Sequence, residues 1–264
     1  MEIAMQKIIF NSVLWLFLFS CTTIISGCAT TSSTAQDPFE GFNRGMFAFN
    51  EGLDKVVLKP VAKGYKAVMP EPINQGVTNF FSNLGDIIVI ANNLLQFKFT
   101  QAASDTGRVV LNSTVGLLGF FDIASKVGFQ KHDEDFGQTL GYWGLGNGPY
   151  LVLPLFGPSS ARDAFGLGAD TFLDPLYYYS SSKSGVKTIA PYAAKAVDDR
   201  SNLLAAEKVL DTAALDKYAY LRDAYLARRE YLVYDGNPPE EDEDDLLFED
   251  DEDDVDDEDD EDDE

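Results

Sequence analysis

The sequence predicts an all-α domain assembled from short helices. Prolines and helix-capping residues divide the chain at short intervals, as at Pro70, Pro72, Asp174-Pro175 and Pro191. Strict alternation of apolar and polar residues, which marks a half-buried strand, is scarce along the chain. The apolar runs are instead bounded by residues that cap helices, so each run is interpreted as a helix.

The first predicted helix begins at Asp37, which stands at the N-cap position with Glu40 three residues later, in the manner of a capping box. Pro60 is expected to end this helix, because proline interrupts the hydrogen-bond ladder of a helix interior. Gly41 and Gly45 lie four residues apart on one face and would let another backbone approach closely.

Three more short helices are predicted in the next part of the chain. One covers about residues 72–84, a second follows Asp86, and a third follows Thr100. Apolar runs such as IIVIANNLL are richer in apolar residues than a helix with one wet side needs, yet far shorter than the roughly 20 residues of a membrane crossing. They suit a protein that lies within a membrane surface or encloses a lipid cavity, or else a soluble domain with a large core.

The last third of the chain continues the helical pattern. Ser159/Ser160 predict a helix running to about Phe172, Asp174-Pro175 the start of the next, and Pro191 the start of another. Segment 200–230 has the cleanest amphipathic pattern of the sequence, with one face kept by a set of apolar and aromatic residues. That face holds Leu203, Leu210, Ala214, Tyr218, Leu221 and Tyr225.

Residues 141–163, GYWGLGNGPYLVLPLFGPSSARD, differ from the rest of the chain. Five glycines and three prolines argue against a regular helix or strand, yet nine of the 23 residues are large and apolar or aromatic. One interpretation is a segment that gates a ligand path, with glycines as hinges. The other is a rigid loop that fills the core, with glycines at tight turns.

The N-terminus carries the pattern of a bacterial lipoprotein signal. Lys7 precedes an apolar stretch that ends in small residues followed at once by Cys28. We therefore predict a cleaved signal peptide over residues 1–27 and a lipidated tether over 28–36, an uncleaved membrane helix being the alternative. Cys21 leaves with the signal peptide and Cys28 carries acyl chains, so no cysteine remains for a disulfide or metal site.

The net charge of −24 belongs to the C-terminus. Residues 240–264 hold 21 Asp and Glu among 25, which leaves the rest of the chain near neutral. A folded domain is therefore predicted over 37–236, followed by a disordered acidic tail over 237–264. This charge pattern argues against nucleic-acid binding, which needs clustered Lys and Arg, and the tail lacks the ligand spacing of a calcium loop.

Catalytic signatures are missing from the sequence. There is no G-x-S-x-G nucleophile elbow and no HExxH zinc motif, and His132 is the single histidine. Since His132 lies in the charged stretch KHDED, we expect it to be a solvated surface residue. A lipolytic enzyme is the alternative that these observations weigh against, and no metal site is predicted.

Five separated motifs in the same order resemble the MlaA/VacJ family of outer-membrane phospholipid-transport lipoproteins. They are DPFEGFNRGMFAFN (37–50), VLKPVAKGYKAVMPEPINQGVTNFFSNL (57–84), NNLLQ (92–96), FGQTLGYWGLGNGPYLVLPLFGPSSARD (136–163) and LDPLY (173–177).

The resemblance implies a ring of helices in the inner leaflet of the outer membrane, around a central amphipathic channel, beside trimeric porins. It implies removal of misplaced phospholipids from the outer leaflet and their transfer to a soluble periplasmic carrier, with no catalytic step and no cofactor. A structural lipoprotein that scaffolds a porin and has no lipid path is the alternative.

The resemblance also assigns site residues. Cys28 would carry the lipid. The hinge loop beside the channel would contain Gly141, Tyr142, Trp143, Gly144, Gly146, Gly148, Pro149, Tyr150, Pro154, Phe156, Gly157 and Pro158. Because a headgroup must be shielded from hydrocarbon, the channel wall should be of mixed polarity. The candidates for this wall are Asn43, Arg44, Phe47, Phe49, Asn50, Asn92 and Asn93. For the polar members of this set, packing between helices is the alternative role.

Overall fold

The fold is described from a computed structural model, in which residues 37–182 and 186–239 are placed. The predicted signal peptide, Cys28 with its tether, and the acidic segment 240–264 lie outside the described residues. The described chain is mostly helical, as predicted, but it also contains one β-hairpin.

The helices follow one another along the chain with short connections. They are α2 (Glu40–Leu53), the π-helical turn η1 (Asp54–Leu58), α3 (Lys59–Val68), α4 (Glu71–Leu95), α5 (Phe99–Thr114), α6 (Ile123–Lys126), α7 (Phe136–Tyr142), α8 (Ala161–Asp170), α9 (Pro175–Ser181), α10 (Val186–Ala213) and α11 (Lys217–Val233).

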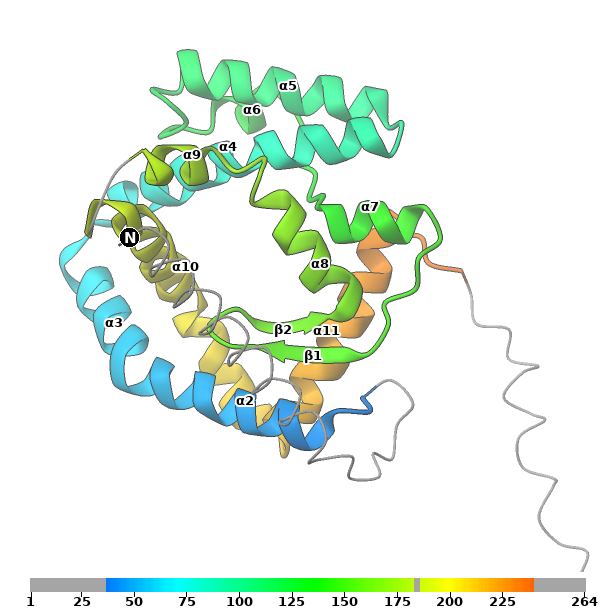
Figure 1. The fold of residues 1–264 in the computed structure, drawn as a ribbon. Helices are drawn as coiled ribbons and strands as arrows, with labels where there is room; N and C mark the ends of the chain where they lie inside the picture. Colours follow the sequence, from blue (N-terminus) through cyan, green and yellow to red (C-terminus); the bar gives the residue numbers. More distant parts are fainter. Residues whose placement is uncertain (1–36, 183–185, 240–264) are drawn as a thin grey trace, which may run out of the picture.

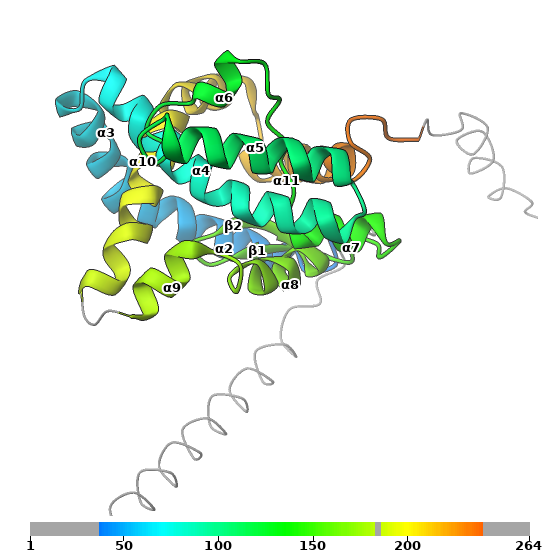
Figure 2. The same ribbon diagram turned by 90° about the horizontal axis from the view of Figure 1, so that it is seen from above.

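Neighbouring elements form a closed circuit (Figure 1). From α2 and η1 the chain enters α3, which contacts α10; α10 contacts α9, and α9 contacts α4. On the other side α4 contacts α7, α7 contacts α11, and α11 returns through the hairpin to α2. Helices α5 and α6 lie outside this circuit, and α8 and α9 lie toward one of its faces (Figure 2).

The predicted helix start at Asp37 and stop at Pro60 are both wrong. Phe39 is the N-cap residue and receives no side-chain cap, while Asp37 is fully buried and binds groups of other elements. The helical path continues from Glu40 to Val68 because η1 shifts the hydrogen bonds by one residue just before Pro60, with Lys59 N–H donating to the Asp54 carbonyl. A π-turn of this kind accommodates a proline within a helical run.

Two further boundaries differ from the prediction. The segments before and after Asp86 form one helix, α4, in which the Asp86 carboxylate is buried against Lys131 rather than capping a helix. Pro191 lies inside α10, which begins at Val186, so only one backbone hydrogen bond is lost. The caps at Ser160 and Asp174 are confirmed, since both side chains accept a backbone N–H of the following helix.

The β-hairpin corrects the expectation that residues 141–163 hold no regular strand. Strand β1 (Tyr150–Leu153) pairs antiparallel with β2 (Gly157–Ser160), with Tyr150 opposite Ser160 and Leu153 opposite Gly157. The strands have four residues each, and Pro158 is tolerated because β2 is an edge strand. The sequence did not predict these strands because segments of four residues are too short to show a clear alternation of apolar and polar residues.

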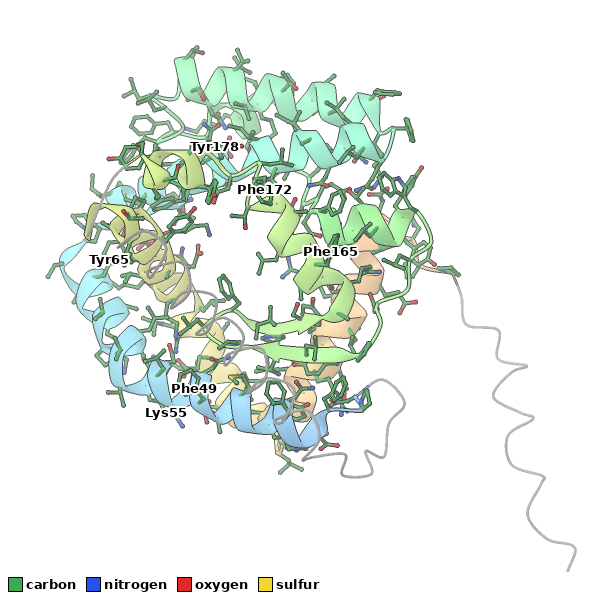
Figure 3. All side chains as sticks on the ribbon, in the orientation of Figure 1. Phe49, Lys55, Tyr65, Phe165, Phe172 and Tyr178 are labelled. Atoms are coloured by element: carbon green, nitrogen blue, oxygen red, sulfur yellow. The ribbon has the colours of Figure 1, made fainter. Side chains whose placement is uncertain are left out.

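Polar residues dominate the interior. Among the described residues, 23 polar or charged side chains are buried but only 10 apolar ones. Many large apolar side chains are exposed instead. Phe49 of α2, Phe165 of α8, Phe172 between α8 and α9, and Tyr178 of α9 are all more than half exposed (Figure 3). This distribution is the reverse of that in water-soluble domains, where Asn, Asp and Arg are mostly at the surface.

Within residues 37–182 and 186–239, no helix has both the length and the hydrophobicity needed to cross a membrane.

Candidate functional site

A cavity of about 710 Å³ lies between α2, β2, α10 and α11. Its size falls in the range of small-molecule sites in proteins. Its apolar lining comes from the two C-terminal helices and from α2 and the hairpin. These lining residues are Phe47, Pro158, Leu203, Ala206, Leu210, Tyr220 and Leu221.

The sequence indicated part of this lining without assigning it to a site. Leu203, Leu210 and Leu221 belong to the amphipathic face found in segment 200–230. In the structure that segment is divided between α10 and α11, and the turn between the helices ends at Asp216, which caps α11. Only the turn brings the two halves of the face onto the same cavity, so periodicity alone could not identify a site there.

Charged residues border the cavity and are paired with one another. Arg200 donates to both carboxylate oxygens of Asp54, at 2.6 and 2.8 Å, and to Glu207 at 2.7 Å. Glu207 also accepts a hydrogen bond from Lys59 at 2.7 Å. Burial alone would raise the pKa of Glu207, but the hydrogen bonds from Arg200 and Lys59 outweigh it and lower that pKa. The cavity therefore combines an apolar lining with ionised groups of both signs.

This combination suits an amphipathic ligand. The apolar lining can hold hydrocarbon by excluding water from it. A phosphate or ammonium group at the border can exchange partners with Arg200 or with the carboxylates of Asp54 and Glu207, since charged groups out of bulk water need partners.

Four of the predicted loop and wall residues line this cavity: Phe47 and Asn50 of α2, and Gly157 and Pro158 of β2. Gly157 has a φ of +82°, in the left-handed region where glycine is favoured. The hairpin tip precedes it, and Phe156 at this tip is 71% exposed.

The other predicted loop residues are spread along the path from α7 to the hairpin. Gly141 and Tyr142 end α7; a Cβ at Gly141 would lie 2.7 Å from the Arg162 guanidinium, so this glycine permits a close approach. Tyr142 and Trp143 are about half exposed, and the Lys98 ammonium lies 5.4 Å from the centre of the Tyr142 ring.

Turn formation explains two more glycines of the loop. Gly144 and Gly148 have φ values of +91° and +64°. Gly146 has no such φ, and nothing lies near the position of its missing Cβ. Pro149 precedes β1, and Pro154 opens the three-residue turn to β2.

Tyr150 lies in the interior rather than on a path. It is 1% exposed, and its ring packs edge-on against Tyr218 and Tyr225. Burial raises its pKa to about 12, with a smaller contribution from Asp37.

Three of the predicted wall residues have the alternative role, packing between elements. Asn43, Asn92 and Asn93 are fully buried. Asn92 donates to Asp170 at 3.0 Å, and Asn93 donates to Asp105 at 3.0 Å. Their amides satisfy polar groups of neighbouring segments, so in this structure they face no open space.

Arg44 pairs with charged residues of α2 and of the turn before α11. Arg44 bonds Glu40 at 2.7 Å and Asp216 at 2.8 Å, and its guanidinium lies 4.4 Å from the centre of the Tyr218 ring. The bond to Asp216 raises the pKa of Arg44. Phe49 is 55% exposed. The expected close approach at Gly45 is absent, since nothing lies within 4 Å of a Cβ built there.

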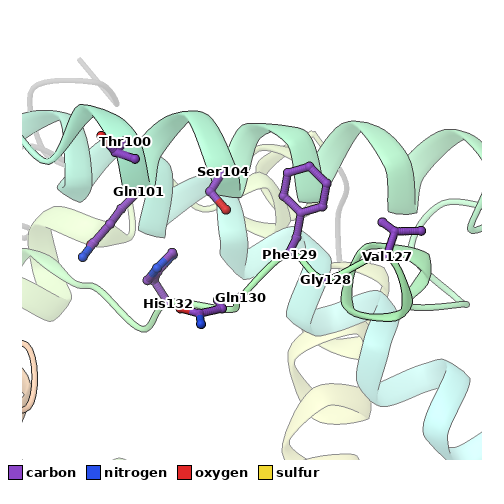
Figure 4. A pocket seen from close by; sticks show the side chains of 8 residues that line it. All are labelled: Thr100, Gln101, Ser104, Val127, Gly128, Phe129, Gln130 and His132. Atoms are coloured by element: carbon purple, nitrogen blue, oxygen red, sulfur yellow. The ribbon is translucent and has the colours of Figure 1, made fainter.

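The expectation of a solvated His132 is wrong. His132 is only partly exposed, and its Nδ1 lies 3.0 Å from both oxygens of the buried Asp105 carboxylate. It borders a second cavity, of about 370 Å³, between α5 and residues 127–132 (Figure 4). Arg162 and Asp163 pair with each other at 3.1 Å.

The chain is similar to known proteins in both sequence and fold. Residues 35–232 match the family described as MlaA lipoprotein. The chain is 33% identical over 238 residues to the intermembrane phospholipid transport system lipoprotein MlaA of Escherichia coli, covering 87% of this chain and 93% of that protein. The protein of the same name from Haemophilus influenzae is also 33% identical, over 86% of this chain and 94% of its own.

A protein of Rickettsia bellii is 34% identical over 219 residues, which is 83% of each chain. A solved structure described as "Structural basis for maintenance of bacterial outer membrane lipid asymmetry" superposes with a TM-score of 0.65 at 32% identity. It covers 75% of this chain and 98% of its own. The chain therefore belongs to the MlaA lipoprotein family.

Proposed function

We propose that this protein is an outer-membrane lipoprotein of intermembrane phospholipid transport, which maintains the lipid asymmetry of the outer membrane. It removes mislocalised phospholipids from the outer leaflet and passes them to a soluble periplasmic carrier, beside a trimeric porin. The family names a transport lipoprotein, so the chain moves its lipid without a covalent step and is not an enzyme.

The observation that carries this proposal is the apolar cavity with a charged border. An acyl chain fits the lining made by Leu203, Leu210 and Leu221, while the border of Arg200, Asp54 and Glu207 can accompany a headgroup. Moving a phospholipid requires both parts, since a headgroup in hydrocarbon without partners is very costly.

The closed circuit of elements supports a more detailed proposal, an amphipathic passage through the ring. Irregular backbone at membrane depth is tolerated where it lines a cavity or packs in protein. The segment from Gly144 to the hairpin is such backbone, and its β2 end borders the cavity. Exposed apolar residues around the circuit would contact the acyl region of the leaflet.

A cavity-filling substitution tests the transport function. Ala206 lines the cavity, so Ala206→Trp would occupy part of it and block lipid entry. Ala205 is the adjacent, exposed residue of α10 that does not line the cavity, and Ala205→Trp is the matched control. The measured quantity is the amount of phospholipid in the outer leaflet of the outer membrane, in cells whose only copy of this protein is the variant.

We expect phospholipid to accumulate in the outer leaflet with Ala206→Trp and to stay at the wild-type level with Ala205→Trp. A lipoprotein that scaffolds a porin and has no lipid path would keep wild-type lipid asymmetry with both substitutions, as long as both variants still co-purify with the porin. Wild-type asymmetry with Ala206→Trp at normal protein abundance would contradict the proposed function.

A further inference from the structure

Among the residues that the structure describes, no strand pairs with the second edge of β1. Its one partner in the two-stranded sheet is β2. Along the other edge lies α2, and the two contact each other. Backbone N–H and C=O groups inside a protein need hydrogen-bond partners. At this edge of β1, side chains of α2 must therefore supply them.

Two asparagines of α2 do this with the same pattern. Asn43 donates from Nδ2 to the Tyr150 carbonyl and accepts at Oδ1 from the Val152 N–H, both at 2.9 Å. Asn50 donates to the Leu153 carbonyl and accepts from the Leu155 N–H, both at 2.8 Å. Each amide thus bonds the carbonyl of one residue and the N–H two residues later, as the N–H and C=O of a single residue in a neighbouring parallel strand do.

The spacing of the two asparagines matches the strand. Asn43 and Asn50 are seven residues apart, which is two helical turns and about 10.5 Å along α2. The two carbonyls that they bond, those of Tyr150 and Leu153, are three strand residues apart, about 10 Å. The dipeptide Phe-Asn occurs at both positions, 42–43 and 49–50.

The two ends of this contact differ in burial. Asn43 is fully buried and also donates to Asp37 at 2.8 Å, and Asp37 in turn accepts the Tyr218 hydroxyl. Breaking that end would leave several buried polar groups without partners. Asn50 is partly exposed and borders the cavity, so water can replace its two hydrogen bonds.

The backbone beyond Asn50 is conformationally unusual. The N–H of Leu155 donates to Asn50, and Leu155 has a φ of +70°, which is uncommon for a residue other than glycine. Its side chain is 70% exposed, so no buried side-chain packing holds the turn. The Asn50 bond is therefore a main support of this turn.

We infer that Asn43 and Asn50 substitute for a third strand, with Asn43 as the fixed end and Asn50 as the releasable end that controls access to the cavity through the hairpin tip. The access part rests on the proposed function, because it assigns the cavity to lipid. When the two hydrogen bonds of Asn50 break, the hairpin tip moves about the end of β1 that Asn43 holds. Gly157 and Pro158 then move away from the cavity border.

Hydrogen exchange of the full mature lipoprotein in detergent, followed at single amides, tests the two ends separately. With Asn50→Leu, which keeps the size of the side chain but not its hydrogen bonds, we expect the Leu155 amide to exchange about tenfold faster. The Val152 amide should keep its wild-type rate. The matched variant Asn43→Leu should accelerate Val152 and lower the overall melting temperature.

Cavity access is measured with a single reporter cysteine, Leu221→Cys, at a partly buried lining position. A maleimide should label it several-fold faster in the Asn50→Leu background. Unchanged exchange at Leu155, equal acceleration at Val152 and Leu155, or an unchanged labelling rate would each overturn the inference. These readouts involve no lipid movement, so their failure is distinguishable from a failure of the transport test at Ala206.

Discussion

At the residue scale, the close approach of α8 to α7 depends on Gly166, which the sequence did not single out. A Cβ at Gly166 of α8 would lie 2.4 Å from the backbone nitrogen of Gly137 in α7. Backbone cannot move aside as a flexible side chain can. The α7–α8 contact therefore requires glycine at this position.

We predict that Gly166→Ala destabilises the fold by about 1–3 kcal/mol through overpacking. Gly168 in the same helix has nothing within 4 Å of a Cβ, so Gly168→Ala should stabilise by up to about 1 kcal/mol through helix propensity. Chemical unfolding in detergent measures both changes. Equal stabilities of the two variants would contradict this account of the α7–α8 contact.

At the element scale, the short helix α6 depends on its cap. The Asp122 carboxylate accepts from the Ser125 N–H at 3.1 Å and from Asn112 at 3.1 Å, and Arg108 lies nearby at 3.3 Å. Burial alone would raise its pKa, but the hydrogen bonds from Ser125 and Asn112 and the charge of Arg108 lower it to about 2. The carboxylate thus joins α5 to α6.

This lowered pKa predicts a dependence of stability on pH. The pKa of Asp122 in the folded protein is below its unfolded value of 3.8. The contribution of its carboxylate to the free energy of unfolding is therefore complete above about pH 5 and is lost as the pH falls through about 2. Since the group is partly exposed, we expect a contribution of about 1 kcal/mol after solvent screening. The difference in unfolding free energy between wild type and Asp122→Asn should shrink by that amount between pH 5 and pH 2. A difference that is constant with pH would rule out this role of the charge.

At the scale of the whole molecule, the polar interior and apolar exterior predict membrane association beyond the lipid anchor. Val56 and Val68 are each more than three-quarters exposed, and Leu117, Leu118 and Phe165 are about two-thirds exposed. Exposing apolar surface to water costs a free energy of roughly 25 cal/mol per Å². An anchor is therefore not the single source of affinity for the bilayer.

We predict that replacing residues 1–28 by an ordinary cleavable secretory signal leaves most of the protein in the membrane fraction. Detergent should release it, whereas washing with high salt or alkaline carbonate should not. A carrier protein without exposed apolar surface, secreted with the same signal, is the control. Recovery of the anchorless protein in the periplasmic extract would contradict this prediction.

The sequence by itself determined those features whose physical causes are local. Ser160 and Asp174 cap helices through bonds to residues two or three positions away, and both were predicted correctly. Helical content follows from the same local signals. The five motifs likewise identified the family, because they are read directly from the chain in order.

Tertiary structure decided what depends on distant partners. Asn43 and Asn50 meet the hairpin across separations of more than 100 residues, and four-residue strands have no pattern of their own. The same is true of the cavity, which exists only where α10 and α11 meet α2 and β2. An asparagine can line a path or cover a strand edge with the same amide, so its role is decided by the groups that the fold places within hydrogen-bonding distance.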